Sequence, residues 1–302
     1  MNRSWAPLQE LLGARLTFGA PLAALTTLGV GGPARILARP DNEVELAATL
    51  KTAREVEAPI FILGLGSNLL FDDAGFDGLV IKLGGEFRMI NLIAPNLIRA
   101  GAGAPCAEAV MRGAGWGLTG LECLAGIPST LGGAVSMNAG SFGGEIGPLV
   151  EEVRYLDREG LAGRLQRDQM DFTYRRFRGL PDGAALTRVD LKLASADGAE
   201  VAARVEANLA ARRAKQPKGV RSAGSVFKNP PGDSAGRLIE ACGFKGQRVG
   251  GAEVSEVHAN FIINRGGAKS ADILELIRRI VETVRDKKGF TLEPEIKIVS
   301  QR

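Results

Sequence analysis

Two glycine-rich loops carry small polar side chains in a pattern that could bind a diphosphate. The stretch from Cys123 to Gly147 holds seven glycines in 25 residues, and residues 64–68 form a second loop, GLGSN. Hydroxyl and amide side chains occur in both: Ser67, Asn68, Ser129, Thr130, Ser136 and Asn138. Backbone N–H groups in such loops can bind an anion without a lysine. Two facing loops could hold a diphosphate, and tight turns between packed strands would explain the same glycines equally well.

The common nucleotide-binding motifs do not fit these loops. A Walker A loop requires Gly-Lys followed by Ser or Thr, and no glycine of this chain precedes that pair. A dinucleotide-binding fingerprint requires GxGxxG, but GLGSNL has Leu69 in place of the third glycine, and GVGGPA and GAGAPC fail similarly. A P-loop is excluded and a Rossmann site is disfavoured.

A serine and a lysine form a second pattern with chemical meaning. Ser225 and Lys228 spell SxxK, the nucleophile motif of penicillin-binding proteins and class A β-lactamases. That chemistry expects SDN and KTG motifs downstream, and the chain has neither. Acyl transfer is therefore kept only as a hypothesis of a different class.

Histidine and cysteine usage limits the remaining chemistry. His258 is the only histidine, so a multi-histidine metal site is excluded, and we expect no bound metal. The cysteines, Cys106, Cys123 and Cys242, are widely spaced and odd in number. This spacing indicates a reducing compartment and three buried thiols rather than a disulfide framework.

Composition indicates a soluble globular protein of two or three domains. Of the 302 residues, 45% are hydrophobic and 24% charged, and the net charge is +4. The mildly basic balance fits an anionic substrate, while only 5% aromatic residues argue against a nucleic-acid surface. The charge-free runs 16–34 and 123–144 lack an apolar core, so we expect no membrane span and a cytoplasmic location.

The elements that would position these residues alternate early and late in the chain. We expect strands at 33–40, 60–63 and 79–83, a helix after Asp41 as its N-cap, and a glycine loop at 64–78. Hairpins are expected at 88–103, turning at Pro95-Asn96, and at 153–165, with a strand at 184–193. Further helices are expected at 105–116, 199–215, 233–243 and 270–289, the last from Ser270 as N-cap to Gly289, before a final strand at 295–299.

Eight motifs in order resemble one enzyme family. They are TTLGVGGPA, LGLGSNLLF, GLTGLECLAGIPSTLGGAVSMNAG, DFTYR, AGSVFKNP, AGRLIEACGFKG, HANFIIN and LEPEIKIV. Together they resemble the UDP-N-acetylenolpyruvoylglucosamine reductases (the MurB family), from about residue 26 to the end. The short chain, without a large inserted loop, is similar to the family's second type.

The resemblance implies an α+β fold with non-covalent FAD. Two subdomains of the vanillyl-alcohol oxidase (PCMH-type) FAD-binding fold would occupy residues 1–84 and 85–215. A C-terminal substrate domain would occupy 216–302, with its last strand possibly returning to the FAD domain. The residues implied to bind FAD are Gly64, Leu65, Gly66, Ser67, Asn68, Gly126, Ile127, Pro128, Ser129, Thr130, Gly133, Ala134, Asn138 and Gly140.

The resemblance also implies a reaction and three catalytic residues. NADPH would reduce the flavin, which would pass hydride to an enolpyruvyl group, so negative charge would develop beside the substrate carboxylate. Arg175 would bind that group, Ser225 would donate the proton, and Glu295 would stabilise the enolate, with Glu293 as its competitor. Phe177 stands where the family has serine, which weakens any role for residue 177.

The remaining expectations concern substrate and partners. Tyr174, Lys215, Lys228 and Asn229 are implied to contact the UDP-sugar, although Lys215 in RRAKQPKGVR could equally belong to a solvated basic helix end. No nucleic-acid or membrane partner is expected. The sequence does not determine the oligomeric state, and a monomer is the working expectation. Another FAD oxidoreductase of the same fold remains the alternative.

Overall fold

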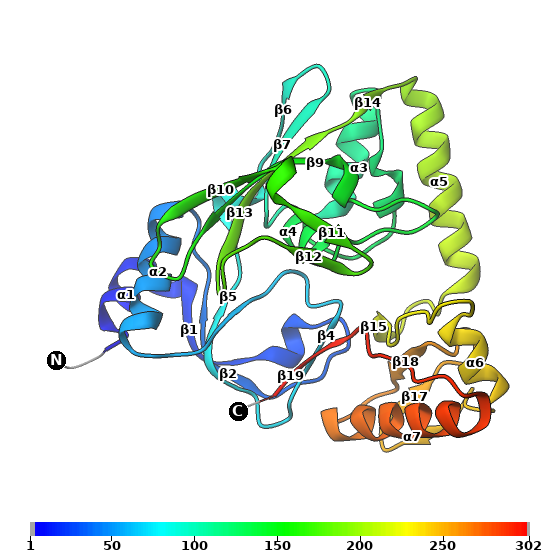
Figure 1. Cartoon of the computed structure of the whole chain (residues 1–302). Coiled ribbons are helices and arrows are strands. Elements are labelled where there is room, and N and C mark those ends of the chain that lie inside the picture. Colours follow the sequence, from blue (N-terminus) through cyan, green and yellow to red (C-terminus); the bar gives the residue numbers. More distant parts are fainter. Residues whose placement is uncertain (1–3, 301–302) are drawn as a thin grey trace. The chain divides into compact units, whose positions relative to one another are not determined.

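The computed structural model describes residues 4–300, and it is an α+β protein (Figure 1). The helices are Ala6–Leu12 (α1), Glu43–Glu55 (α2), Cys106–Gly115 (α3), Leu131–Ser136 (α4), Gly198–Lys215 (α5), Ala235–Ala241 (α6) and Ser270–Lys288 (α7). The strands before α4 are Leu16–Pro21 (β1), Pro33–Ala38 (β2), Ile60–Ile62 (β3), Leu69–Phe71 (β4), Phe76–Ile81 (β5), Ile90–Ala94 (β6), Leu97–Gly101 (β7) and Leu118–Thr119 (β8). The later strands are Val150–Leu156 (β9), Ala162–Gln166 (β10), Asp171–Thr173 (β11), Arg176–Arg178 (β12), Ala185–Lys192 (β13), Ala194–Ser195 (β14), Arg221–Ser225 (β15), Arg248–Val249 (β16), Ala252–Val254 (β17), Phe261–Asn264 (β18) and Lys297–Val299 (β19).

The chain forms two compact units, each assembled from separated segments. Unit 1 contains residues 4–18, 36–65 and 78–211, and unit 2 contains residues 19–35, 66–77 and 212–300. A four-stranded sheet of order β1-β2-β5-β3 includes three strands, β1, β2 and β5, that contribute residues to both units.

Unit 1 is built on a five-stranded antiparallel sheet of order β10-β9-β13-β7-β6. Its hairpin β6–β7 pairs Ala94 with Leu97, so the turn at Pro95-Asn96 is confirmed. Fully buried Val153 and Val189 of this sheet belong to the same apolar core as Leu46 of α2 and Ala109 of α3. This core holds the five-stranded sheet against α2 and α3.

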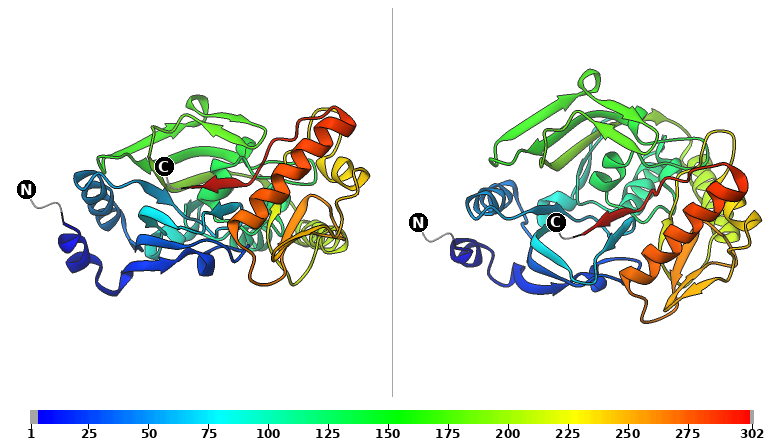
Figure 2. Two further views of the ribbon diagram at one scale, coloured as in Figure 1. Left: turned by 90° about the horizontal axis from the view of Figure 1, so that it is seen from below. Right: turned by 60° about the horizontal axis from the view of Figure 1, so that its bottom comes forward.

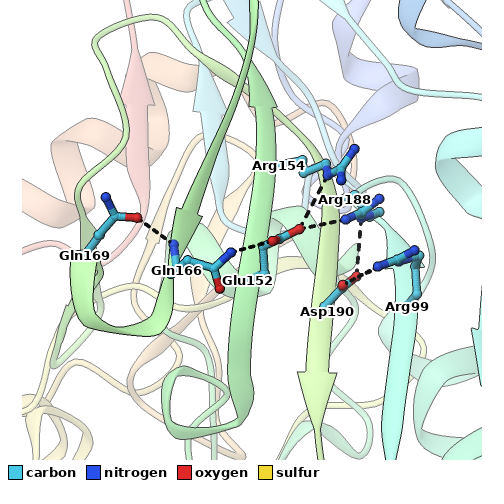
Figure 3. A network of polar contacts seen from close by, with 7 residues as sticks. All are labelled: Arg99, Glu152, Arg154, Gln166, Gln169, Arg188 and Asp190. Atoms are coloured by element: carbon cyan, nitrogen blue, oxygen red, sulfur yellow. Dashed lines mark hydrogen bonds and ion pairs between the residues drawn. The ribbon is translucent and has the colours of Figure 1, made fainter. Parts of the chain in front are cut away.

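A chain of alternating charges crosses this sheet (Figure 3). Arg99 on β7 donates two hydrogen bonds to Asp190 on β13, and Arg188 reaches both Asp190 at 3.3 Å and Glu152 at 2.7 Å. Gln166 on β10 closes the row by donating to Glu152 at 2.6 Å. Because Asp190 and Glu152 are largely buried, these partners satisfy carboxylates that would otherwise be costly.

The helices follow the expected pattern with two corrections at their starts. Helix α2 begins one residue later than predicted, because the Asn42 side chain, and not Asp41, accepts the N–H of Glu45. Asp41 instead binds Arg15 through its carboxylate. In α7, Ser270 is the first helical residue and Lys269 the N-cap, whereas Gly289 ends the helix in the left-handed conformation as predicted.

Unit 2 contains a four-stranded sheet of order β15-β18-β17-β16 that packs against α7 (Figure 2). Ile273, Ile277, Ile280 and Val284 form the buried stripe of α7, and the core continues through Leu238 of α6. Leu28, Val30 and Leu70 join this core from early parts of the chain. The C-terminal region therefore shares its core with segments around residues 28 and 70.

The region expected as a glycine loop at 64–78 contains a strand. Leu69–Phe71 (β4) pairs in parallel with the final strand β19, and a three-residue apolar run flanked by asparagine and aspartate gave too little pattern to predict it. The strand expected at 79–83 begins earlier and spans Phe76–Ile81 (β5). Helices α1 and α4, the hairpin β11–β12 and strands β1, β8 and β14–β18 were not predicted either.

Candidate functional site

The loop at residues 64–68 presents consecutive backbone donors. Within the described residues, the N–H groups of Gly64, Leu65, Gly66, Ser67 and Asn68 donate no hydrogen bond to the protein. Gly66 has a φ of 67°, a conformation that favours glycine, and its carbonyl accepts the N–H of Thr27 at 3.1 Å. Successive unsatisfied amides of this kind suit an anion, so the loop fits the diphosphate of FAD.

The second glycine loop meets the first one inside unit 1. A Cβ added to Gly64 would lie 2.8 Å from Oγ1 of Thr130, so these two positions are in contact. The Thr130 hydroxyl caps α4 by accepting the N–H of Gly133, and the Ser129 hydroxyl donates to the Thr130 carbonyl. Both hydroxyls thus shape the loop, while Gly126, with a φ of 73°, turns the chain that carries Ile127 and Pro128.

Several glycines of this loop are required by the protein's own packing. A Cβ at Gly140 would lie 2.0 Å from the Gly144 carbonyl oxygen, and one at Gly144 would lie 2.8 Å from Cys123 Cβ. A Cβ at Gly132 would lie 2.9 Å from Ala102, and one at Gly147 would lie 2.7 Å from both Asn138 and Phe172. Tight chain packing therefore explains these glycines without a cofactor, as the alternative interpretation of the sequence allowed.

A cluster of cations near the first loop escaped the sequence analysis. Leu63, next to Gly64, donates its N–H to Ile81, and Lys82 follows directly. Burial lowers the pKa of half-buried Lys82, and the positive charges of Arg39 and Arg88 lower it further. Such a cluster favours an anionic ligand, and only the three-dimensional pairing of β2 with β5 brings Arg39 to Lys82.

Arg175 lies at the tip of a short hairpin in unit 1. Strands β11 and β12 pair Thr173 with Arg176, so Tyr174 and Arg175 form a two-residue turn. Arg175 has a φ of 56°, a conformation that is unfavourable for a residue with a side chain, and its guanidinium lies 5.0 Å from the centre of the Tyr174 ring. Strained residues of this kind are concentrated at functional sites.

Ser225 and Glu295 are brought together within unit 2. The N–H of Glu295 donates to the carbonyl of Val226 at 2.7 Å, one residue after Ser225. Ser225 follows Gly224, whose φ is 75°, at an irregularity in the pairing of β15 with β18. Asn68 donates its side-chain amide to the Glu295 carbonyl at 3.0 Å, so one residue expected to bind FAD also fixes the backbone of a residue expected to be catalytic.

The competing candidates are engaged elsewhere. Glu293 is exposed and forms an ion pair with Lys228 at 2.5 Å. An ammonium held in an ion pair is not available as the base that SxxK chemistry needs, and Ser225 ends a strand rather than opening a helix. Asn229 accepts the N–H of Ala235, and Lys215 is the exposed last residue of α5.

Histidine and cysteine are placed in packed surroundings. The His258 ring lies tilted against that of Phe261, with ring centres 5.0 Å apart, and burial lowers the pKa of His258. All three cysteines are buried and form no disulfide. Burial raises the pKa of Cys106 to about 12 and that of Cys123 to about 11. These groups have the properties of core residues.

Comparison with known proteins identifies the family. The model of the UDP-N-acetylenolpyruvoylglucosamine reductase C-terminal domain matches residues 216–299, and that of an FAD binding domain matches residues 33–165. A protein of this name from Moorella thermoacetica is 47% identical over 96% of this chain and 95% of its own length. The chain belongs to the UDP-N-acetylenolpyruvoylglucosamine reductases. A relative from Anaeromyxobacter is 45% identical over 93% of this chain and 88% of its own.

Solved structures agree with this family and confirm the predicted fold. The UDP-N-acetylenolpyruvylglucosamine reductase of Thermus caldophilus aligns with a TM-score of 0.81 and 42% identity, covering 94% of this chain and 98% of that one. Berberine bridge enzyme from Eschscholzia californica, at 16% identity, aligns over 64% of this chain with a TM-score of 0.50, which supports only a shared FAD-binding fold. Among residues 4–300, no helix is both long and apolar enough to span a membrane.

Proposed function

We propose that the protein reduces UDP-N-acetylglucosamine enolpyruvate to UDP-N-acetylmuramate, a step of peptidoglycan precursor synthesis, with FAD as cofactor and NADPH as reductant. The observation that carries this proposal is the family relationship, at 47% identity over nearly the whole chain. Bound FAD would accept hydride from NADPH and supply it to the enolpyruvyl carbon. The loop at 64–68 and the cations Arg39, Lys82 and Arg88 would hold its diphosphate non-covalently.

The residues of this chain would handle the charge and the proton. The Arg175 guanidinium would bind the substrate carboxylate through its fixed fork of donors and stabilise the negative charge that develops beside it. The Ser225 hydroxyl would donate the proton that completes reduction of the double bond. Glu295 would stabilise the enolate, and its backbone bond to Val226 supports its placement close to Ser225.

The remaining expectations belong to the same proposal. Tyr174, Lys215, Lys228 and Asn229 would contact the UDP-sugar, with Lys215 at the diphosphate. The enzyme would work as a cytoplasmic monomer without a nucleic-acid or membrane partner.

The test is substrate-dependent oxidation of NADPH by the flavin-loaded enzyme. We expect absorbance at 340 nm to fall only when the enolpyruvyl sugar nucleotide is present, and the product mass to rise by that of two hydrogens. Ser225→Ala should lose turnover by about 10²–10⁴-fold while the bound flavin is still reduced by NADPH. A variant that keeps full turnover would remove Ser225 as the proton donor, and no turnover in the unaltered enzyme would refute the function.

A further inference from the structure

Asn138 ends helix α4 in a position that normally favours glycine. The N–H of Ala139 donates to Ala134 at 2.8 Å and that of Asn138 to Val135 at 3.0 Å, the two bonds of a Schellman motif. Asn138 is the left-handed residue of the motif, with a φ of 40°. Glycine adopts this conformation at no steric cost and is abundant in the same loop, so the choice of asparagine calls for a reason in its side chain.

The buried side chain of Asn138 makes three hydrogen bonds, two to residues 145–147 and one to Thr173. Its Oδ1 accepts the N–H of Gly147 at 2.9 Å. Its Nδ2 donates one hydrogen to Glu145 Oε2 at 2.7 Å and the other to the Thr173 carbonyl at 3.1 Å. Both donors of the amide are thereby used, and the residue is only 1% exposed.

The third of these bonds fixes the turn that carries Arg175. Thr173 is the last residue of β11, directly before Tyr174 and Arg175. Phe172 packs against Gly147, where a Cβ would lie 2.7 Å from its ring, and stacks on Phe177 at 4.6 Å between ring centres. The turn that carries the strained arginine is therefore tied to the glycine-rich region by this hydrogen bond and by the packing of Phe172 against Gly147.

We propose that Asn138 is a positioning residue that couples the end of the glycine-rich loop to the orientation of Arg175. This inference rests on the proposed role of Arg175 in binding the substrate carboxylate. Without the Asn138 amide, the Thr173 carbonyl loses the hydrogen bond that ties it to the end of α4, and the turn can relax out of the left-handed conformation at residue 175. A displacement of about 1 Å at a charge-stabilising group can cost about a hundred-fold in rate.

Two substitutions separate the side chain of Asn138 from its backbone. Asn138→Gly keeps the helix end, because glycine suits the left-handed position, but removes all three bonds. Asn138→Asp keeps the acceptor for Gly147 and replaces both donors by a carboxylate oxygen facing Glu145 and Thr173. Asn42→Asp is the matched control, since it makes the same change at a helix N-cap where aspartate also serves.

The measurement separates the two halves of the reaction in flavin-loaded enzyme by rapid mixing. For both Asn138 variants we expect flavin reduction by NADPH within about three-fold of wild type, and reoxidation by the enolpyruvyl substrate slowed about a hundred-fold. The family resemblance placed Asn138 among the FAD-binding residues, but its side chain is buried and hydrogen-bonded within the protein, so FAD affinity, followed by flavin fluorescence, should change little. Equal loss in both halves together with weakened FAD binding would mean that Asn138 serves the cofactor site instead, and unchanged reoxidation would overturn the inference.

Substitution of Glu145, which accepts a hydrogen bond from Asn138, gives a further test. Glu145→Gln alone should be nearly silent, because a glutamine oxygen can still accept from Asn138. Combined with Asn138→Asp, the glutamine can donate to the introduced carboxylate, but the bond to the Thr173 carbonyl is not restored, so we expect reoxidation to stay as slow as in the single variant. Full recovery in the double variant, with both proteins folded by circular dichroism, would contradict the role of the Thr173 bond.

Failure of this inference is distinguishable from failure of the proposed function. If Arg175→Lys retains the wild-type rate of reoxidation, the proposed role of Arg175 is wrong, and Asn138 then has no catalytic side chain to position. If Arg175→Lys is impaired but the Asn138 variants are not, only the positioning role is lost.

Discussion

At the scale of single residues, Arg175 combines conformational strain with a proposed charge-stabilising role. Its φ of 56° costs an arginine roughly 1–2 kcal/mol that a glycine would not lose. Arg175 is therefore expected to lower the stability of the fold while it supports activity, and the two effects can be measured separately.

Arg175→Gly is predicted to keep or raise stability while abolishing activity. Removal of the strain should raise the free energy of unfolding by up to about 1 kcal/mol, because glycine suits the left-handed turn. Loss of the guanidinium should lower kcat by more than about a hundred-fold. Denaturant unfolding and turnover of one sample check both; a clear destabilisation would show that the arginine side chain supports the hairpin instead.

The thiols of Cys106 and Cys123 are predicted to be unreactive in the folded enzyme. Burial raises the pKa of Cys106 to about 12 and of Cys123 to about 11, so almost no thiolate is present at neutral pH. Alkylation followed by peptide mass mapping should leave both unmodified until denaturant is added. Rapid labelling of either residue in native protein would contradict the burial that the structure gives them.

At the scale of elements, Glu253 on β17 is a buried carboxylate between two arginines. Its side chain is 1% exposed, and it accepts hydrogen bonds from Arg265 and Arg248, at 2.6 and 2.5 Å. These bonds hold the pKa of Glu253 below its ordinary value, the bond from Arg265 being the largest cause. A lowered carboxyl pKa contributes stability above the ordinary pKa and loses it as the pH falls towards the folded value.

Glu253→Gln is predicted to destabilise the protein in a pH-dependent way. At pH 7 the variant should lose about 2 kcal/mol, since the arginines lose a charged acceptor. The difference from wild type should shrink as the pH falls below about 4, the ordinary carboxyl pKa, because the unfolded wild-type chain then takes up a proton that folded Glu253 still resists. Thermal unfolding of both proteins across pH 3–8 tests this, and a difference that does not depend on pH would argue against the ionised carboxylate.

Two helix ends offer a matched pair of glycine substitutions. Gly289 ends α7 with a φ of 74°, whereas Gly115 is the last residue of α3 with an ordinary helical backbone, and neither has a neighbour that a Cβ would touch. Gly289→Ala should cost about 1 kcal/mol and Gly115→Ala should gain about half as much. If both substitutions changed the stability in the same direction, backbone conformation would not be what determines their effects.

Sequence patterns predict some of these elements and not others. The turn at Pro95-Asn96 and the end of α7 at Gly289 were predictable because each depends on a few adjacent residues. The β11–β12 hairpin was not, since an arginine occupies the left-handed turn position where glycine or asparagine would have signalled a turn. The contacts of Asn138 with Gly147 and Thr173 depend on long-range folding, and only the family resemblance pointed to Arg175, Ser225 and Glu295.

At the scale of the whole molecule, unit 2 is assembled from three separate parts of the chain. Its core includes Leu28, Val30 and Leu70 beside the C-terminal helices. The region matched by the C-terminal family model, residues 216–299, therefore lacks part of its own core.

The isolated fragment 212–302 is predicted not to fold cooperatively. Loss of the Leu28, Val30 and Leu70 side chains and of the β4 partner of β19 exposes apolar surface worth about 1.5–3 kcal/mol per side chain. We expect a broad thermal transition and strong binding of an apolar dye, against a sharp transition of the full chain. A sharp transition of the fragment would show that the C-terminal helices and sheet suffice.

The pairing of β4 with β19 also sets an order of events in synthesis. Residues 69–71 emerge early from the ribosome, yet their strand partner, residues 297–299, is translated last. At about 5–20 residues per second the early segment waits some tens of seconds for its neighbour. During that interval an apolar strand has an open edge, which is the situation in which a strand can pair with a wrong partner.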